Sequence, residues 1–215
     1  MTSAKLHHEF SGTASGCPLL LIHGLGHDMK YYADVKQAFE DAFHVLRVDV
    51  RGHGLSEKPT TATNVTELAQ DIIELLDSLG VGHFAVLGHS MGGALAQQVA
   101  ILAHARVSAM VLVATSSRVG SAARKEYDRM AAESEAAGRF ALAAVQRAMG
   151  SYNMDSQLEQ LSIPTYIISG EKDPLTPVKA GQIIQQHVRG SVFEVFEGCG
   201  HNMLQESTVV IDKVK

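Results

Sequence analysis

Short apolar runs separated by stretches of helical periodicity recur along the whole chain. The strand-length runs are residues 19–22, 45–50, 83–87, 110–114, 165–169 and 192–196. Because they are continuously apolar rather than alternating, they indicate strands covered on both faces, as in a parallel sheet. The clearest helical pattern covers residues 65–79, with Asn64 or Thr66 as its cap and Gly80 as its stop. The alternation predicts an α/β fold with a mainly parallel central sheet flanked by helices.

Two segments depart from this alternation. Residues 5–10 are expected to add an antiparallel edge strand, and the region after residue 114 is long. Residues 121–137 and 139–149 predict two helices that separate near Gly138. We expect a short helical cap, within residues 117–160, over the carboxyl edge of the sheet. The alternative is an ordinary crossover helix with a long arm. By its length, the chain of residues 1–215 is expected to form one domain.

Composition excludes several classes of partner. The formal net charge is −5 and no cluster of Lys and Arg occurs, which argues against nucleic acid and anionic membranes. The longest apolar runs have the length of strands and are far too short for a membrane span. Residues 1–10 lack the apolar segment of a signal peptide, so a cytoplasmic location is expected. The sequence leaves the oligomeric state open.

The cysteine and histidine positions predict neither a disulfide nor a cofactor. Cys17 precedes one expected strand and Cys199 follows another, which places them at opposite ends of the sheet. Cys199 is two residues from His201 and is either a small packing residue or a reactive thiol. No H-x-H, H-E-x-x-H, C-x-x-C or G-x-G-x-x-G pattern is present. We therefore expect no metal and no nucleotide cofactor.

The most informative motif is a serine between two glycines at the end of an apolar run. Residues 84–87 are apolar, residues 93–102 are typical of a helix, and between them lies Gly88-His89-Ser90-Met91-Gly92. A strand, a tight turn with a serine at its apex and a helix form the context of the G-x-S-x-G nucleophile elbow. The motif predicts that the Ser90 hydroxyl projects beyond the sheet at the start of a helix.

The partners of such a serine are expected beyond the carboxyl ends of other strands. Asp173 follows the run at 165–169, and His201 follows the run at 192–196. The order Ser, Asp, His is that of the α/β hydrolases, in which the histidine takes the serine proton and the carboxylate holds the histidine tautomer. Glu171 is a weaker candidate for the acid. The run ending at residue 114 is followed by no carboxylate.

The glycine-rich segment from His23 to His27 directly follows the apolar run at residues 19–22. Its Leu25 amide and the Met91 amide are expected to form an oxyanion hole for a tetrahedral intermediate. His23 is expected to hold this segment through the backbone, whereas His27 is open to contact with substrate. His89 is expected to support packing, because successive residues at a tight turn point apart.

Five motifs in this order resemble the α/β-hydrolase superfamily. They are His23-Gly24-Leu25-Gly26, the run from Asp49 to Ser56, Gly88 to Gly93, Gly170-Glu171-Lys172-Asp173 and Gly200-His201. The resemblance is to small esterases, lactonases such as oxoadipate enol-lactonases, and C–C bond hydrolases. It implies Ser90 as nucleophile, Asp173 as acid and His201 as base, with Leu25 and Met91 as oxyanion donors and Arg51 as a tie between loops. The segment between residues 114 and 163 is shorter than the usual cap, which implies an open pocket.

These observations predict a serine hydrolase that cleaves small-molecule carboxylic esters, lactones included. The alternatives are C–C bond cleavage or a perhydrolase reaction on the same triad, or a ligand receptor with little turnover. A small or medium apolar acyl group is expected. The reason is that five apolar side chains lie near the site loops in sequence: Met29, Tyr31, Met91, Leu175 and Met203.

Overall fold

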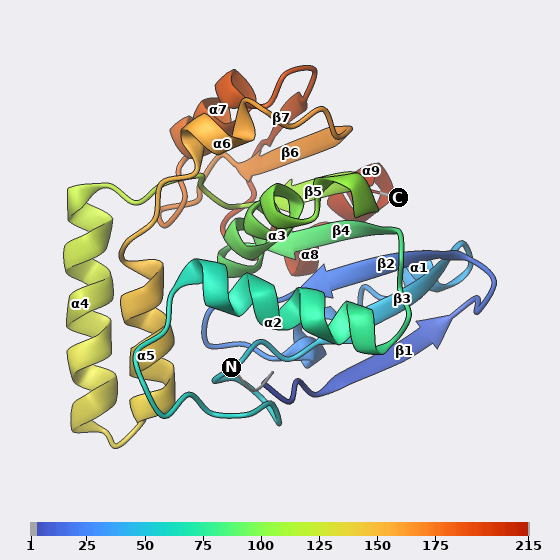
Figure 1. The fold of residues 1–215 in the computed structure, drawn as a ribbon. Coiled ribbons are helices and arrows are strands. Elements are labelled where there is room, and N and C mark those ends of the chain that lie inside the picture. The colour runs from blue at the N-terminus through green and yellow to red at the C-terminus, as the bar shows by residue number, and fades with distance from the viewer. Residues whose placement is uncertain (1–3, 215) are drawn as a thin grey trace.

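In the computed structural model, which describes residues 4–214, seven strands form one sheet with the order β1-β3-β2-β4-β5-β6-β7 (Figure 1). The strands are β1 (His8–Gly12), β2 (Cys17–Ile22), β3 (Phe43–Val48), β4 (Phe84–His89), β5 (Val107–Val113), β6 (Thr165–Gly170) and β7 (Val192–Phe196). Only β1 pairs antiparallel with its neighbour. The mainly parallel sheet is therefore confirmed.

All predicted strands are present, but most of their boundaries differ from the prediction by one to three residues. The edge strand begins at His8 instead of Lys5, and β3 ends at Val48 instead of Val50. His8 is opposite Val48, and beyond this pair the Asp49 carboxylate accepts backbone N–H groups from other loops. The Asp49 N–H still donates to the His7 carbonyl at 2.9 Å, and the chain then continues as a loop in which Val50 is fully buried.

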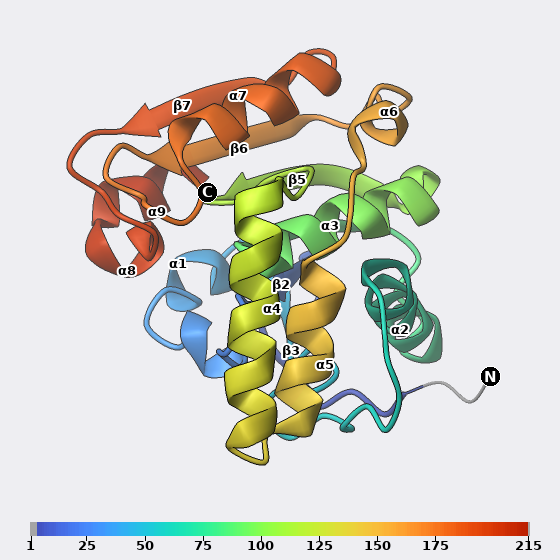
Figure 2. The same cartoon turned by 90° about the vertical axis from the view of Figure 1, so that its left-hand side faces the viewer.

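Helices cover both faces of the sheet (Figure 2). One face carries α2 (Val65–Ser78), α3 (Met91–Leu102) and α7 (Val178–His187), and the other carries α1 (Gln37–Glu40), α8 (Met203–Glu206) and α9 (Thr208–Val214). Leu20 and Ile22 of β2 pack in the first layer, while Leu19 and Leu21 pack in the second. Both sides of the strand are buried in apolar surroundings, which explains why its sequence does not alternate. The shorter elements are α6 (Asp155–Leu158) and the 3-10 helices Met29–Tyr32 and His104–Arg106.

Helix α2 begins at the predicted Val65 and ends at Ser78, one residue before the predicted end. The Asn64 side chain accepts a hydrogen bond from the Glu67 amide at 2.9 Å, so Asn64 and not Thr66 is the cap. After Leu79 the chain turns at Gly80, whose φ of +68° lies in the left-handed region. The two ends of α2 are therefore set by Asn64 and by the turn at Gly80.

A helical hairpin stands at the end of the sheet toward which β2 points (Figures 1 and 2). It consists of α4 (Ser121–Ala136) and α5 (Phe140–Met149), which are joined through Gly138 at φ +73°. Its two ends are tied together, because the Met154 amide donates to the Ser117 carbonyl at 2.9 Å. The Asp155 carboxylate also accepts the Ser117 hydroxyl at 2.5 Å and an Arg118 N–H at 2.8 Å. Both predicted helices are present; the boundary of the cap at residues 117–160 stays a prediction.

Within residues 4–214, no helix combines the length and the apolar character needed to cross a membrane. Both cysteines are free, Cys17 on the surface and Cys199 buried.

Candidate active site

Ser90 occupies a sharp turn between β4 and α3. Its φ of 55° and ψ of −117° are rare for a residue with a side chain and indicate local strain. The backbone passes so close to β2 that a Cβ atom on Gly92 would lie 1.9 Å from the Ile22 carbonyl oxygen. A Cβ atom on Gly88 would lie 2.2 Å from the Gly92 carbonyl oxygen. Both glycines are therefore required by the close approach of backbone to backbone, as the motif predicts.

The structure brings Ser90, His201 and Asp173 into one hydrogen-bonded chain. His201 Nε2 lies 2.9 Å from Ser90 Oγ, and His201 Nδ1 lies 2.8 Å from Asp173 Oδ2. Asp173 follows β6 and His201 follows β7, so all three residues stand beyond the carboxyl ends of parallel strands. Residues more than a hundred positions apart in sequence thus meet in the predicted order.

Asp173 is held as an ionised acceptor. It is only 4% exposed, and its carboxylate accepts the Leu175 amide at 2.8 Å, the Thr176 amide at 3.0 Å and the Thr176 hydroxyl at 2.6 Å. Burial opposes ionisation, but the hydrogen bonds from His201 and Thr176 outweigh it, and the pKa of the carboxyl is lowered. A carboxylate accepts only, so His201 Nδ1 must donate, and the Nε2 lone pair faces the serine hydroxyl.

Glu171, the weaker candidate for the acid, has a different partner. Its carboxylate accepts the Gly198 amide at 2.9 Å and is exposed to solvent. Glu171 therefore joins the two loops that carry Asp173 and His201.

The two amides predicted for an oxyanion hole flank the serine. Leu25 lines the same cavity as Ser90, and Met91 is the first residue of α3. The amides beside Leu25 are engaged, since Gly26 donates to His53 Nε2 at 3.1 Å and His27 donates to the Gly24 carbonyl at 3.2 Å. Among residues 4–214, no protein acceptor is paired with the N–H of Leu25 or of Met91. Both donors are thus free for a ligand oxygen.

Side chains below the site hold its loops. His23 donates from Nδ1 to the Gly24 carbonyl at 2.8 Å and accepts the Val50 amide at Nε2 at 3.0 Å, so it bridges two loops as expected. Arg51 forms an ion pair with Asp71 of α2 and is not among the residues that line the serine cavity, which agrees with a role as a tie between segments.

Two buried histidines make the fold sensitive to acid. Burial lowers the pKa of His23 to about 4 and that of His89 to about 3, with nearby histidines adding to each shift. In the unfolded chain both titrate near pH 6.5. As the pH falls below this value, the unfolded state binds more protons than the folded state, so stability falls until the folded pKa values are reached. Each histidine contributes at most about 1.4 kcal/mol per pH unit.

Urea unfolding at pH 7, 6 and 5 measures this effect. We expect the free energy of unfolding to fall by about 2–3 kcal/mol between pH 6 and pH 5 from these two histidines together. A free energy that stays constant over this interval would contradict the burial of neutral imidazoles.

A cavity of about 580 Å³ opens over Ser90. One wall is α4, which contributes five residues: Ala122, Ala123, Glu126, Tyr127 and Met130. The rest of the lining comes from the site loops and includes Leu25, His27, Leu175 and His201. His27 lines the cavity, and its contact with substrate stays a prediction. Polar side chains also line the cavity, among them Thr176, Asn202 and Glu126, whose carboxylate is paired with Arg129.

The apolar side chains predicted for this cavity were largely wrong. Leu175 lines it, but Met29, Met91 and Met203 are buried in the core, and Tyr31 faces a second cavity. Proximity to a loop in sequence does not determine which way a side chain points, and these methionines fill the space below the loops. Tyr127 and Met130, the larger apolar side chains of α4, line the cavity although the sequence did not place them at the site.

Comparison with known proteins places the chain in a family. The sequence model described as "alpha/beta hydrolase fold" matches residues 18–152. The chain belongs to the α/β-hydrolase fold family. The chain is 25% identical over 226 residues to 3-oxoadipate enol-lactonase 2 of Acinetobacter baylyi, covering 89% of this chain and 85% of the relative.

Solved structures agree with the family assignment. This α/β hydrolase is similar to a hydrolase from Pseudomonas aeruginosa with a TM-score of 0.90 and 26% identity, over 98% of this chain and 92% of the other. It is equally similar in fold to an esterase from Thermogutta terrifontis, with a TM-score of 0.90, 23% identity and the same coverage.

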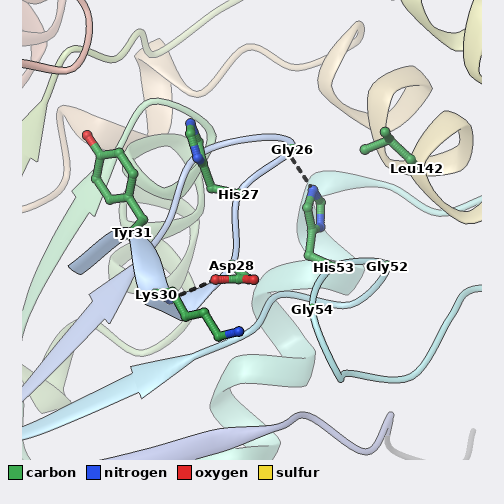
Figure 3. Close-up of a pocket in the computed structure, with 9 residues that line it drawn as sticks. All are labelled: Gly26, His27, Asp28, Lys30, Tyr31, Gly52, His53, Gly54 and Leu142. Carbon is green, nitrogen blue, oxygen red and sulfur yellow. Dashed lines mark hydrogen bonds between the residues drawn. The ribbon is translucent and has the colours of Figure 1, made fainter. Parts of the chain in front are cut away.

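A second cavity of about 470 Å³ adjoins the first in this α/β hydrolase (Figure 3). His27 lines both cavities. Gly26 and His53, whose hydrogen bond joins two loops, line the second cavity. Leu142 of α5 faces it from the hairpin. Within the described range 4–214, no three or more His, Cys, Asp or Glu side chains are grouped so that they could hold a metal ion.

Proposed function

We propose that this protein is a serine hydrolase that cleaves carboxylic esters, lactones included, through an acyl-enzyme on Ser90. The observation that carries the proposal is the hydrogen-bonded chain from Ser90 Oγ through His201 to Asp173, at the floor of a largely apolar cavity. Serine alone is a weak nucleophile, and this arrangement supplies both the base and the group that orients it.

In the proposed reaction, Ser90 Oγ attacks the acyl carbon while His201 Nε2 takes its proton. The resulting oxyanion accepts hydrogen bonds from the amides of Leu25 and Met91, each worth about 3 kcal/mol in the transition state. The C–O bond to the alcohol breaks as His201 returns the proton to the leaving oxygen. Water, deprotonated by the same imidazole, then attacks the acyl-enzyme and releases the acid, which regenerates Ser90.

The lining of the cavity indicates the acyl group. Leu25, Tyr127, Met130 and Leu175 offer apolar surface above the serine, and the volume of about 580 Å³ suits a small or medium acyl chain. Because an enol-lactonase is among the relatives, lactones are included in the proposed substrate range.

Initial rates on p-nitrophenyl esters from acetate to decanoate, and on simple lactones, test this proposal. We expect turnover with an optimum among the short or medium chains and a decline toward decanoate. No ester or lactone turnover from the folded protein would overturn the proposal. Turnover of a vinylogous diketo acid would then indicate C–C hydrolysis. Oxidation of a reporter dye in the presence of peroxide and acetate would indicate a perhydrolase. A ligand-induced rise in melting temperature without turnover would indicate a receptor.

A further inference from the structure

His89 is a buried polar residue that the proposed reaction does not use. It precedes Ser90 directly, is 1% exposed and contributes to the lining of the serine cavity. Its Nε2 atom lies 2.8 Å from the backbone carbonyl oxygen of His201, 112 positions away in sequence. A carbonyl oxygen only accepts, so His89 Nε2 carries the proton and Nδ1 is a lone pair.

The other side of the imidazole is pressed against the loop that carries Leu25. A Cβ atom on Gly24 would lie 2.9 Å from His89 Nδ1 and 3.4 Å from the Ser90 Cβ atom. One face of the ring stacks on Tyr31, with centroids 4.6 Å apart and an angle of 15° between the planes. The ring therefore has no freedom to turn, and it touches the serine turn, the Gly24 loop and the His201 loop at once.

A purely packing role does not account for this residue. Within residues 4–214, Nδ1 of His89 is buried with no hydrogen-bond partner, which costs stability. An apolar side chain would fill the space without that cost. What the imidazole adds is a single directed donor, Nε2–H, and that donor is used on the backbone of His201.

The neutral state of His89 also suits its position. Its ring centroid lies 4.9 Å from that of His201, which becomes an imidazolium during the proposed reaction. Burial, and next the neighbouring His201, lower the pKa of His89 to about 3, so it stays neutral at working pH. It can thus hold the His201 backbone without placing a second positive charge beside the developing imidazolium.

We propose that His89 is a positioning residue: its Nε2–H fixes the backbone of His201 so that the imidazole lies in line between Ser90 and Asp173. The kinetic test of this inference rests on the proposed function, because it measures ester turnover. A displacement of about 1 Å of a catalytic group can cost about 100-fold in rate, which sets the scale of the expected effect.

Two variants separate positioning from packing. His89→Gln places an amide donor as far along the side chain as Nε2, whereas His89→Asn places its amide where Nδ1 was and cannot reach the His201 carbonyl. We expect His89→Asn to lower kcat by about 100-fold with little change in KM, and His89→Gln to restore most of the activity. Equal losses in both variants, or losses that follow the melting temperatures at pH 8, would overturn the proposal.

A readout without turnover keeps this test separate from the proposed function. The proton between His201 Nδ1 and Asp173 gives a low-field ¹H NMR signal when the two groups are held together. We expect the signal in the wild-type chain and in His89→Gln, and its loss in His89→Asn. If the wild type has the signal but cleaves no ester, the ester hydrolase proposal fails while His89 is still tested. If His89→Asn keeps the signal unchanged, the positioning role is wrong.

Discussion

Replacing Ser90 with alanine is expected to lower kcat for the best p-nitrophenyl ester by about 10⁵-fold. The substitution removes the nucleophile, and His201 Nε2 loses the hydroxyl 2.9 Å away from which it takes a proton. The residual rate then comes from binding and from the oxyanion amides alone. Initial rates of the two proteins, measured at saturating ester, give the ratio directly.

Stability does not confound this comparison. Alanine keeps the Cβ atom, so the strained φ of 55° at position 90 is equally costly in both proteins. Ser116→Ala is the matched control, because that hydroxyl contacts the Tyr152 hydroxyl at 2.9 Å and does not line the cavity over Ser90. We expect the control to keep its activity. A loss of only a few-fold in Ser90→Ala would show that another group attacks the ester.

Asp173→Asn is expected to lower kcat by about 10⁴-fold. The carboxylate accepts from His201 Nδ1 at 2.8 Å, and this bond leaves Nε2 free to take the serine proton. An asparagine amide can donate to Nδ1 instead, which puts the proton on Nε2 and prevents it from acting as a base. The measurement is the kcat of the variant for the same ester, with the melting temperature as a check on folding.

Glu171→Gln is the matched control for this prediction. It lies two residues away, carries the same charge and binds the Gly198 amide rather than His201. We expect a change of no more than a few-fold. If Glu171→Gln were as damaging as Asp173→Asn, the assignment of the acid would be wrong.

The parts of the site that the sequence predicts are those fixed by local geometry or by strand order. Gly88 and Gly92 occupy positions where a side chain would collide with the backbone. The turn at Ser90 can therefore be predicted from residues that adjoin it in sequence. Asp173 and His201 follow strands that are parallel neighbours, so their common edge follows from the alternation of strands and helices.

The parts that it does not predict depend on contacts between distant segments. The wall formed by Tyr127 and Met130 requires knowing how α4 lies over the sheet, because α4 has only a weak apolar stripe. The bond from His89 to the His201 carbonyl joins two loops through a backbone atom, for which no side-chain pattern exists. The methionines expected in the cavity are buried in the core. Proximity to a loop in sequence does not determine the direction of a side chain.

Covalent labelling shows directly which residue of the protein is the nucleophile. The protein is incubated with a fluorophosphonate, which reacts with activated serines, and the mass of the intact chain and of its peptides is measured. We expect one adduct per chain, on the peptide that contains Ser90, and none in Ser90→Ala. An adduct on another residue, or equal labelling of Ser90→Ala, would contradict the claim that Ser90 is the nucleophile.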